Sequence, residues 1–228
     1  PQIDYAGAGL SYNADVQNPK ALNAELPSGV NLGDGCQEWK QPDGRCVFTR
    51  DAQVGLFRVW RDGIGTSVFT DVYAITNHFS SGPDGRVEQR TEQAAYNAAL
   101  VEALAGTDDG SRVVVGGDFN VFPRPDDPFP PPGTSDQLAP LYEVGLNDLW
   151  AVVNAEAPES AYSYVFNGQA QTLDNQFTTD ALFGELNGVR FAHINADWPA
   201  AHADDGSRGA SDHDPQAARF DAARVDAL

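Results

Sequence analysis

The residues that most constrain the fold are 113–120, which read Val-Val-Val-Gly-Gly-Asp-Phe-Asn. Three β-branched residues in succession are typical of a buried strand, and the two glycines after them let the backbone turn freely. Asp118 and Asn120 follow on the strand's exit, where both can face one cleft. A carboxylate there can hold a divalent cation or act as a base, and an amide can hold a phosphate oxygen without repulsion. The alternative is an ordinary turn, because Asp and Asn are common in turns as well.

The periodicity around this strand predicts one α/β domain spanning residues 1–228. Residues 1–49 are rich in Asn, Gly, Pro and Asp and form an irregular lead-in. Further elements are predicted from alternating or helical patterns: strands at 54–60, 67–76, 189–195 and 217–220, and helices at 87–105 and 137–144. Asn167-Gly168, between strands at 163–166 and 170–178, predicts a β-hairpin with a type I′ turn. Its return strand carries Asp174.

The charge of the chain limits the partners it can bind. There are 33 acidic and 14 basic side chains, for a net charge of −19, and Lys20 and Lys40 are the only lysines. This balance argues against a basic nucleic-acid cradle, so a polyanionic substrate would require bound cations or local arginines. Arg86 and Arg90, at the start of the predicted helix, are within reach of the cleft or serve only as surface residues. No apolar run is long enough for a membrane span, and no signal peptide is visible.

The two cysteines favour an exported protein. Cys36 and Cys46 lie ten residues apart in a Gly-, Pro- and Asp-rich segment, and the chain has no other cysteine. A local disulfide in a secreted or periplasmic protein is the preferred interpretation, and two cytosolic thiols are the alternative. A zinc site is disfavoured because no histidine lies near the pair. The chain contains no methionine, so we expect further residues before Pro1 in the full protein.

Other strand ends carry the remaining candidates for a catalytic site. His78 follows a strand and precedes a Ser/Gly loop, where it serves as an acid, a hydrogen-bond donor or an ordinary surface residue. Asp212 and His213 are adjacent, so Asp212 can bind a metal while His213 reaches substrate. Asp174 can orient His213 by accepting its ring proton. Together these groups suit metal-assisted phosphodiester hydrolysis, whereas no Gly-x-Ser-x-Gly elbow for serine hydrolysis is present.

Three ordered strings then resemble the endonuclease/exonuclease/phosphatase superfamily, and most closely its secreted bacterial nucleases. They are Gly-Asp-Phe-Asn at 117–120, Thr-Leu-Asp at 172–174 and Ser-Asp-His-Asp-Pro at 211–215. Asn-His-Phe at 77–79 and His-Ile-Asn-Ala-Asp at 193–197 look like the same branch. The resemblance extends from about residue 50 to residue 220. It implies a four-layer sandwich of two mixed β-sheets flanked by helices.

The resemblance also implies roles at the metal and the phosphate. Asp118 would orient or deprotonate the attacking water beside a Mg²⁺, Mn²⁺ or Ca²⁺ ion, and Asp212 would be a further metal ligand. Asn120 would bind the scissile phosphate. His213 would form a hydrogen bond to the phosphate with Asp174 behind it, and His78 would be the second histidine. The expected substrate is DNA or RNA, cleaved with low sequence preference.

One departure from the family pattern leaves alternatives open. Members carry an asparagine and then a metal-binding glutamate in their first sheet, in a strand reading roughly apolar-Gln-Glu. Gln37-Glu38 lies in the wrong surroundings for that strand, so we expect that the family's first strands are missing from this chain. The alternatives are an enzyme acting on a lipid or small phosphoester, which the acidity favours, and a non-catalytic module. The sequence does not indicate the oligomeric state.

Overall fold

The computed structural model describes residues 2–4, 47–48, 50, 52–60, 69–82, 85–106, 110–124, 135–198 and 210–221. The expected disulfide between Cys36 and Cys46 and the Gln37-Glu38 pair lie outside the described residues.

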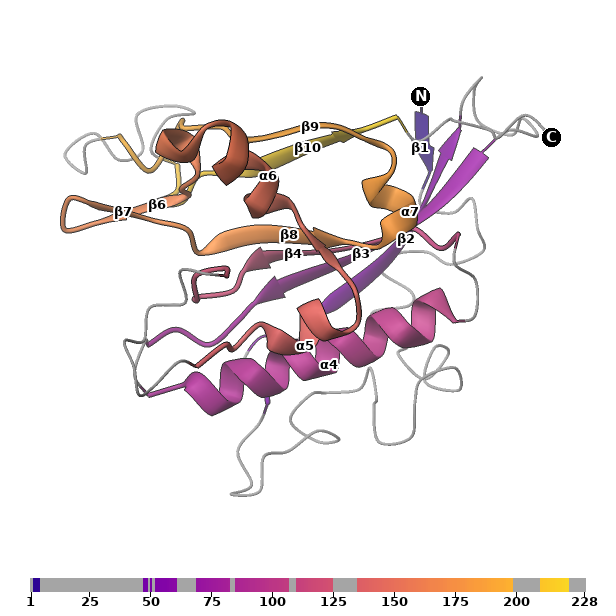
Figure 1. Cartoon of the computed structure of the whole chain (residues 1–228), viewed down its shortest axis with the longest axis horizontal. Helices are drawn as coiled ribbons and strands as arrows, with labels where there is room; N and C mark the ends of the chain where they lie inside the picture. The colour runs from indigo at the N-terminus through magenta and orange to yellow at the C-terminus, as the bar shows by residue number, and fades with distance from the viewer. Residues whose placement is uncertain are drawn as a thin grey trace.

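The centre of the fold is a six-stranded sheet with the order β1-β2-β3-β4-β8-β5 (Figure 1). Its strands are β1 (Gln2–Asp4), β2 (Gln53–Trp60), β3 (Phe69–His78), β4 (Val113–Asp118), β5 (Asn147–Asp148) and β8 (Asp174–Thr178). β3 and β4 are parallel and are joined by helix α4 (Val87–Ala105), whereas the other neighbouring strands are antiparallel. A parallel connection requires a crossover of this length, which explains the helix between the two strands.

Smaller elements cover the sheet on both sides. They are α5 (Ala139–Glu143), α6 (Leu149–Glu156), η1 (Pro158–Ser160), α7 (Asp180–Phe183), the hairpin β6 (Tyr164–Phe166) and β7 (Gln169–Gln171), and the antiparallel pair β9 (Leu186–Phe191) and β10 (Gln216–Phe220). Figure 1 shows α4 and α5 along one face of the large sheet and the β9–β10 pair with α6 on the opposite side. The predicted α/β sandwich of sheets flanked by helices is therefore confirmed. In the described residues the second sheet consists of β9 and β10 alone.

The main core lies between the large sheet and α4. Val113 and Val115 are fully buried, as expected for the strand of three valines. Next to them Phe119 packs edge to face between Phe79 and Phe177, with ring centroids 4.9 and 5.7 Å away. Such aromatic pairs add to the stabilisation from burial alone. The residue between Asp118 and Asn120 is thus part of the core and fixes the strand exit.

Helix α4 follows the predicted bounds but buries polar side chains toward the sheet. Arg90 is 1% exposed and donates to the backbone carbonyls of Ser80 and Gly82, both at 2.9 Å. Gln93 accepts from the Ser80 N–H and donates to the Val47 carbonyl. These bonds satisfy backbone groups of loops that have no strand partner, as buried polar groups require. Arg90 therefore holds the loop after β3 and does not reach into the cleft.

Two predicted strands differ from the structure. The return strand at 170–178 is divided, because β7 ends at Gln171 and β8 begins at Asp174 in the large sheet. Ser163 Oγ accepts hydrogen bonds from the backbone N–H groups of Leu173 and Asp174, which stabilises this break. β9 ends at Phe191 and so stops short of 195. Among the described helices, none combines the length and the apolar character needed to cross a membrane.

Candidate active site

Three neighbouring strands of the large sheet bring polar residues to one end. His78, the last residue of β3, is in register with Asp118, the last residue of β4. Asp118 is in turn opposite Asp174, the first residue of β8. Figure 1 shows these strand ends together at the left edge of the sheet. Residues separated by up to about a hundred positions in the chain therefore meet through strand pairing alone.

Gly117 makes the close approach of β3 and β4 possible. It has φ of 138°, and a Cβ atom placed there would lie 2.0 Å from the backbone oxygen of Asn77. No side chain fits at that distance, so only glycine allows the two strands to pair up to His78 and Asp118.

Asp118 and Asn120 form one hydrogen-bonded unit. Asp118 Oδ1 accepts from the Asn120 N–H at 2.8 Å, and Oδ2 accepts from Asn120 Nδ2 at 3.0 Å. Asn120 Nδ2 also donates to the Phe79 carbonyl at 3.1 Å, and the residue has a left-handed φ of 52°. Both amide hydrogens are thus occupied, since an amide nitrogen has only two. In this structure Asn120 fixes the Asp118 carboxylate, and its phosphate-binding role remains a prediction.

His213 and Asp174 form the closest ion pair of the site. His213 Nδ1 lies 2.6 Å from Asp174 Oδ2, and both side chains are about one-fifth exposed. Tyr164 of β6 is bridged to His213 through the backbone, and its ring stacks on the imidazole with centroids 4.6 Å apart. The predicted orienting contact between Asp174 and His213 is therefore present. The stacking by Tyr164 is an additional constraint that the sequence analysis did not identify, since it depends on the bridge between distant segments.

Burial and neighbouring charges shift the pKa values of two site residues. Burial raises the pKa of Asp118 above its ordinary 3.8, and the nearby Asp174 carboxylate raises it further, against the hydrogen bond from Asn120. The hydrogen bond to Asp174 raises the pKa of His213 above its ordinary 6.5, although burial opposes this change. The site thus favours a protonated imidazole beside carboxylates that repel each other.

Replacing Asp174 with asparagine is expected to lower the pKa of His213 toward 6.5, because the charge-assisted hydrogen bond is lost. The raised pKa also makes stability depend on pH. The pair's contribution is fully present below about pH 6.5, the unfolded value, and is lost as the pH rises through the folded pKa. Titration of the His213 ring by NMR in metal-free protein measures the shift directly.

The control for this titration is Asp71→Asn, which removes the partner of Arg58 at the opposite end of β3. It should leave the His213 titration unchanged. A His213 pKa that is the same in wild type and in Asp174→Asn would contradict the assigned ion pair.

The carboxylates of the site are suited to a hard divalent cation. Asp118, Asp174 and His213 each offer a ligand atom, and these atoms all lie within 4.8 Å of one another. Two carboxylates in register on adjacent strands repel each other unless a cation or proton lies between them. Mg²⁺ is commonly held by one or two carboxylates together with substrate phosphate oxygens. The donor set therefore fits a divalent ion, with Asp118 and Asp174 as the oxygen ligands within this group.

Asp212 and His78 lie at the margin of the cluster. Asp212 is exposed and is not in the group of converging ligand atoms, although its charge contributes to the raised pKa of His213. Its role as a metal ligand stays a prediction. His78 is 44% exposed, its Nε2 lies 3.5 Å from Asp118 Oδ2, and the guanidinium of Arg50 contacts its ring. Arg50 supplies positive charge here that the sequence analysis did not assign to the site.

Asp214 stabilises the loop behind the site. It is fully buried, and its Oδ1 accepts from the N–H groups of Ile194 and Asn195 at 2.8 and 2.7 Å, while Oδ2 contacts His193. Burial opposes ionisation of Asp214, but the backbone hydrogen bonds outweigh it and hold the pKa below the ordinary value. The string at 211–215 contained Asp214, yet only the folded loop shows what this carboxylate binds.

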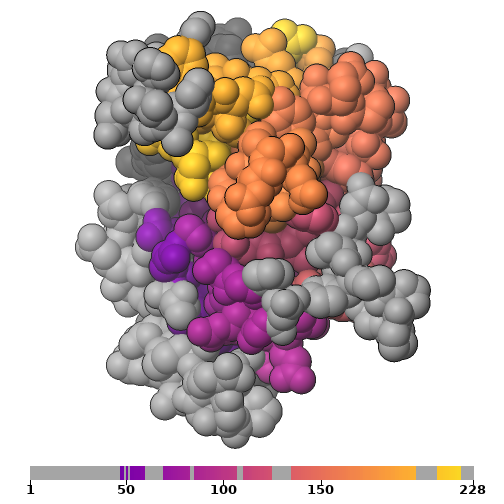
Figure 2. Space-filling model, turned by 90° about the vertical axis from the view of Figure 1, so that its left-hand side faces the viewer, coloured from indigo at the N-terminus to yellow at the C-terminus, as the bar shows by residue number. Residues whose placement is uncertain are grey.

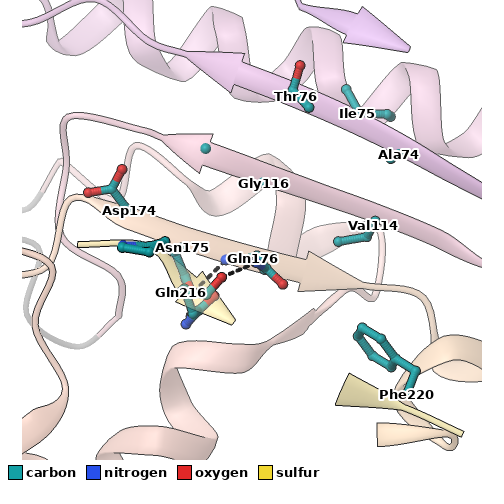
Figure 3. Close-up of a pocket in the computed structure, with 12 residues that line it drawn as sticks. Ala74, Ile75, Thr76, Val114, Gly116, Asp174, Asn175, Gln176, Gln216 and Phe220 are labelled. Atoms are coloured by element: carbon teal, nitrogen blue, oxygen red, sulfur yellow. Dashed lines mark hydrogen bonds between the residues drawn. The ribbon is translucent and has the colours of Figure 1, made fainter. Parts of the chain in front are cut away.

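A cavity of about 390 Å³ extends from the site between the large sheet and β10 (Figure 3). Asp174 lies at one end of it in Figure 3 and Phe220 at the other, with Gly116 of β4 along the wall. Gln176 Nε2 donates to the Gln216 carbonyl inside the cavity at 2.8 Å. The cavity is thus lined by residues of the large sheet and of β10, and Asp174 is one of its lining residues.

Comparisons with known proteins find solved structures that are similar to this chain at low sequence identity. No family model and no curated protein matches this chain. Similar solved structures include an AP endonuclease from Archaeoglobus fulgidus, the 3′-5′ exonuclease NExo from Neisseria meningitidis and an endonuclease/exonuclease/phosphatase from Bacteroides vulgatus. Their identities are 16%, 21% and 18%, and their TM-scores 0.47, 0.46 and 0.44. The matches cover 72%, 70% and 73% of this chain and 69%, 67% and 53% of the other chains.

Proposed function

We propose that this chain is a divalent-metal-dependent phosphodiester hydrolase, and most specifically a nuclease that cleaves DNA or RNA with low sequence preference. The observation that carries the proposal is the convergence of Asp118, Asp174 and His213, with Asn120 and His78 beside Asp118. Carboxylates for a cation, a base for water and a charged imidazole for phosphate are the groups that phosphodiester hydrolysis requires.

Asp118 is assigned to the attacking water. Its carboxylate is held by two hydrogen bonds from Asn120, so it keeps one orientation toward a water molecule beside it. A divalent ion bound beside Asp118 and Asp174 would offset the negative charge of the phosphate. We propose Mg²⁺ as this ion, with Mn²⁺ or Ca²⁺ as alternatives. Asp212 is proposed as a further ligand of that ion.

His213 is assigned to the phosphate. Its bond to Asp174 favours the imidazolium, which stabilises negative charge on the phosphate oxygens as water attacks. Stacking by Tyr164 restricts rotation of the imidazole, so the ring keeps one orientation relative to the substrate. His78, with Arg50 against it, supplies a second donor on the opposite side of Asp118.

A second candidate substrate is a lipid or small phosphoester, cleaved by the same residues. The net charge of −19 favours it, because nucleases normally gain affinity by neutralising many phosphates. We also propose that the protein acts outside the cytosol, on the basis of the isolated pair Cys36 and Cys46.

The test compares hydrolysis of DNA, RNA, sphingomyelin and inositol phosphates with Mg²⁺ and with EDTA. We expect turnover of nucleic acid in Mg²⁺ and none after chelation. Calorimetric titration with Mg²⁺ identifies the alternative of a non-catalytic module: binding at millimolar concentration or weaker, together with no turnover of any substrate, would disprove the enzyme.

A further inference from the structure

The hairpin β6–β7 carries a run of aromatic rings that begins at the candidate active site. The Tyr164 ring stacks on His213, and Phe166 stacks in turn on Tyr164, with centroids 6.2 Å apart and planes 17° from parallel. The two aromatic residues are two positions apart on one strand, so their side chains share a face of the hairpin. Phe166 is 51% exposed, one of the most exposed large apolar side chains among the described residues.

The same face carries amides in place of charges. Phe166 pairs with Gln169 and Tyr164 pairs with Gln171, and side chains directly opposite each other lie on the same side of a hairpin. None of residues 163–173 is charged, in a chain whose net charge is −19. Figure 2 shows this hairpin, in orange, projecting at the end of the molecule where the site lies. The hairpin itself therefore adds no negative charge that would repel a polyanion at the site.

Aromatic rings and amides together are suited to an unstacked nucleobase. Stacking of a base on an aromatic ring needs no phosphate neutralisation and tolerates every base, because each has a π-face. Amide groups of Gln169 and Gln171 can bond to the edge of such a base. A base inside a duplex is already stacked on its neighbours and is not available to the hairpin.

We infer that the Phe166 face of the hairpin is a subsite that stacks an unpaired base of a single-stranded substrate next to the phosphodiester bound at His213. This inference rests on the proposed function and deepens it, since it names single-stranded nucleic acid as the substrate class. It also explains how so acidic a chain gains affinity for a polyanion, because the favourable binding free energy comes from stacking of a base on an uncharged surface.

The experiment measures binding in EDTA, so that it does not depend on hydrolysis. The probes are fluorescein-labelled single-stranded oligothymidylate and an oligomer of equal length and charge in which every base is absent. Phe166→Ala is expected to weaken binding of oligothymidylate about 5- to 150-fold, from the usual contribution of one stacked base. Binding of the baseless oligomer should not change. Phe166→Trp keeps an aromatic face and should restore the affinity.

The matched control is Val165→Ala, which truncates the neighbouring side chain on the opposite face of β6. It should bind both probes as wild type does, and thermal unfolding confirms that each variant is folded. Equal binding of oligothymidylate by wild type and Phe166→Ala would overturn the inference, as would a wild type that does not prefer oligothymidylate to the baseless oligomer. If the expected binding pattern is found without hydrolysis of any substrate, the proposed function fails and the base-binding subsite stands.

Discussion

Replacement of His213 with alanine is expected to lower kcat/KM for a phosphodiester by about 10²–10⁴-fold, the usual range for a residue that transfers or stabilises charge at the reacting centre. In the proposed mechanism the variant loses the imidazolium that Asp174 and Tyr164 hold and that would stabilise charge on the phosphate. Steady-state hydrolysis of single-stranded DNA in Mg²⁺ measures the effect. The His213 side chain is about one-fifth exposed and does not belong to the buried core, so the variant should keep its fold.

The double variant that combines His213→Ala with Asp174→Asn distinguishes two roles of Asp174: orienting His213 and binding the metal ion. If Asp174 acts through His213, Asp174→Asn alone costs about 10–100-fold, and the double variant is no worse than His213→Ala. If Asp174 acts mainly as a metal ligand, the two losses multiply and Mg²⁺ affinity falls in the single variant. Full activity in His213→Ala would remove His213 from the site.

Asp212→Ala belongs in the same experiment. A loss of activity as large as that of His213→Ala, together with weaker Mg²⁺ binding, would establish this exposed carboxylate as a metal ligand. Wild-type activity would instead leave the ion to Asp118 and Asp174, whose ligand atoms already converge.

Replacement of Phe119 with alanine is expected to destabilise the protein by about 3–5 kcal/mol, the range found for removal of a buried aromatic side chain. Phe119 is completely buried and packs edge to face against Phe79 and Phe177. Its removal leaves a cavity directly behind Asp118 and Asn120, so activity should fall as well. Urea unfolding, analysed for both midpoint and slope, measures the change in free energy.

The same substitution at an exposed phenylalanine is the control. Phe166→Ala, at a side chain that is 51% exposed, should change the free energy of unfolding by no more than about 1.5 kcal/mol, because the stacking on Tyr164 is lost but no buried cavity forms. Equal destabilisation at both positions would mean that Phe119 is not the core residue described here.

Local patterns of the sequence predicted most of the regular structure. The strand of three valines, helix α4 and the Asn-Gly turn of the β6–β7 hairpin were predicted from residue periodicity and turn chemistry. Asn167 and Gly168 have positive φ, as a type I′ turn requires. The division of the return strand before Asp174 was not predicted, because it depends on the hydrogen bond that the Asp174 N–H donates to Ser163 Oγ. Nothing in the residue pattern of the strand indicates that bond.

Helix α4 shows why periodicity has limits. Its buried side includes Arg90, Gln93 and Asn97, which a hydrophobic pattern places at the surface. Arg90 and Gln93 are buried because they form hydrogen bonds with backbone groups of the loop after β3. Those backbone groups lose their contact with water only when the loop packs on the helix.

The sequence by itself determined which residue types stand at the strand ends: the aspartates, the asparagine and the histidines of the candidate site. Only the tertiary structure decided how they are used. In the fold, Asn120 donates both amide hydrogens to neighbouring groups, and Asp174 forms a hydrogen bond with His213. Asp212 is exposed, and the rings of Tyr164 and Phe166 stack next to His213. The reason is physical: residue identity fixes the available donors, acceptors and charges, whereas their pairing depends on strand register between segments far apart in the chain.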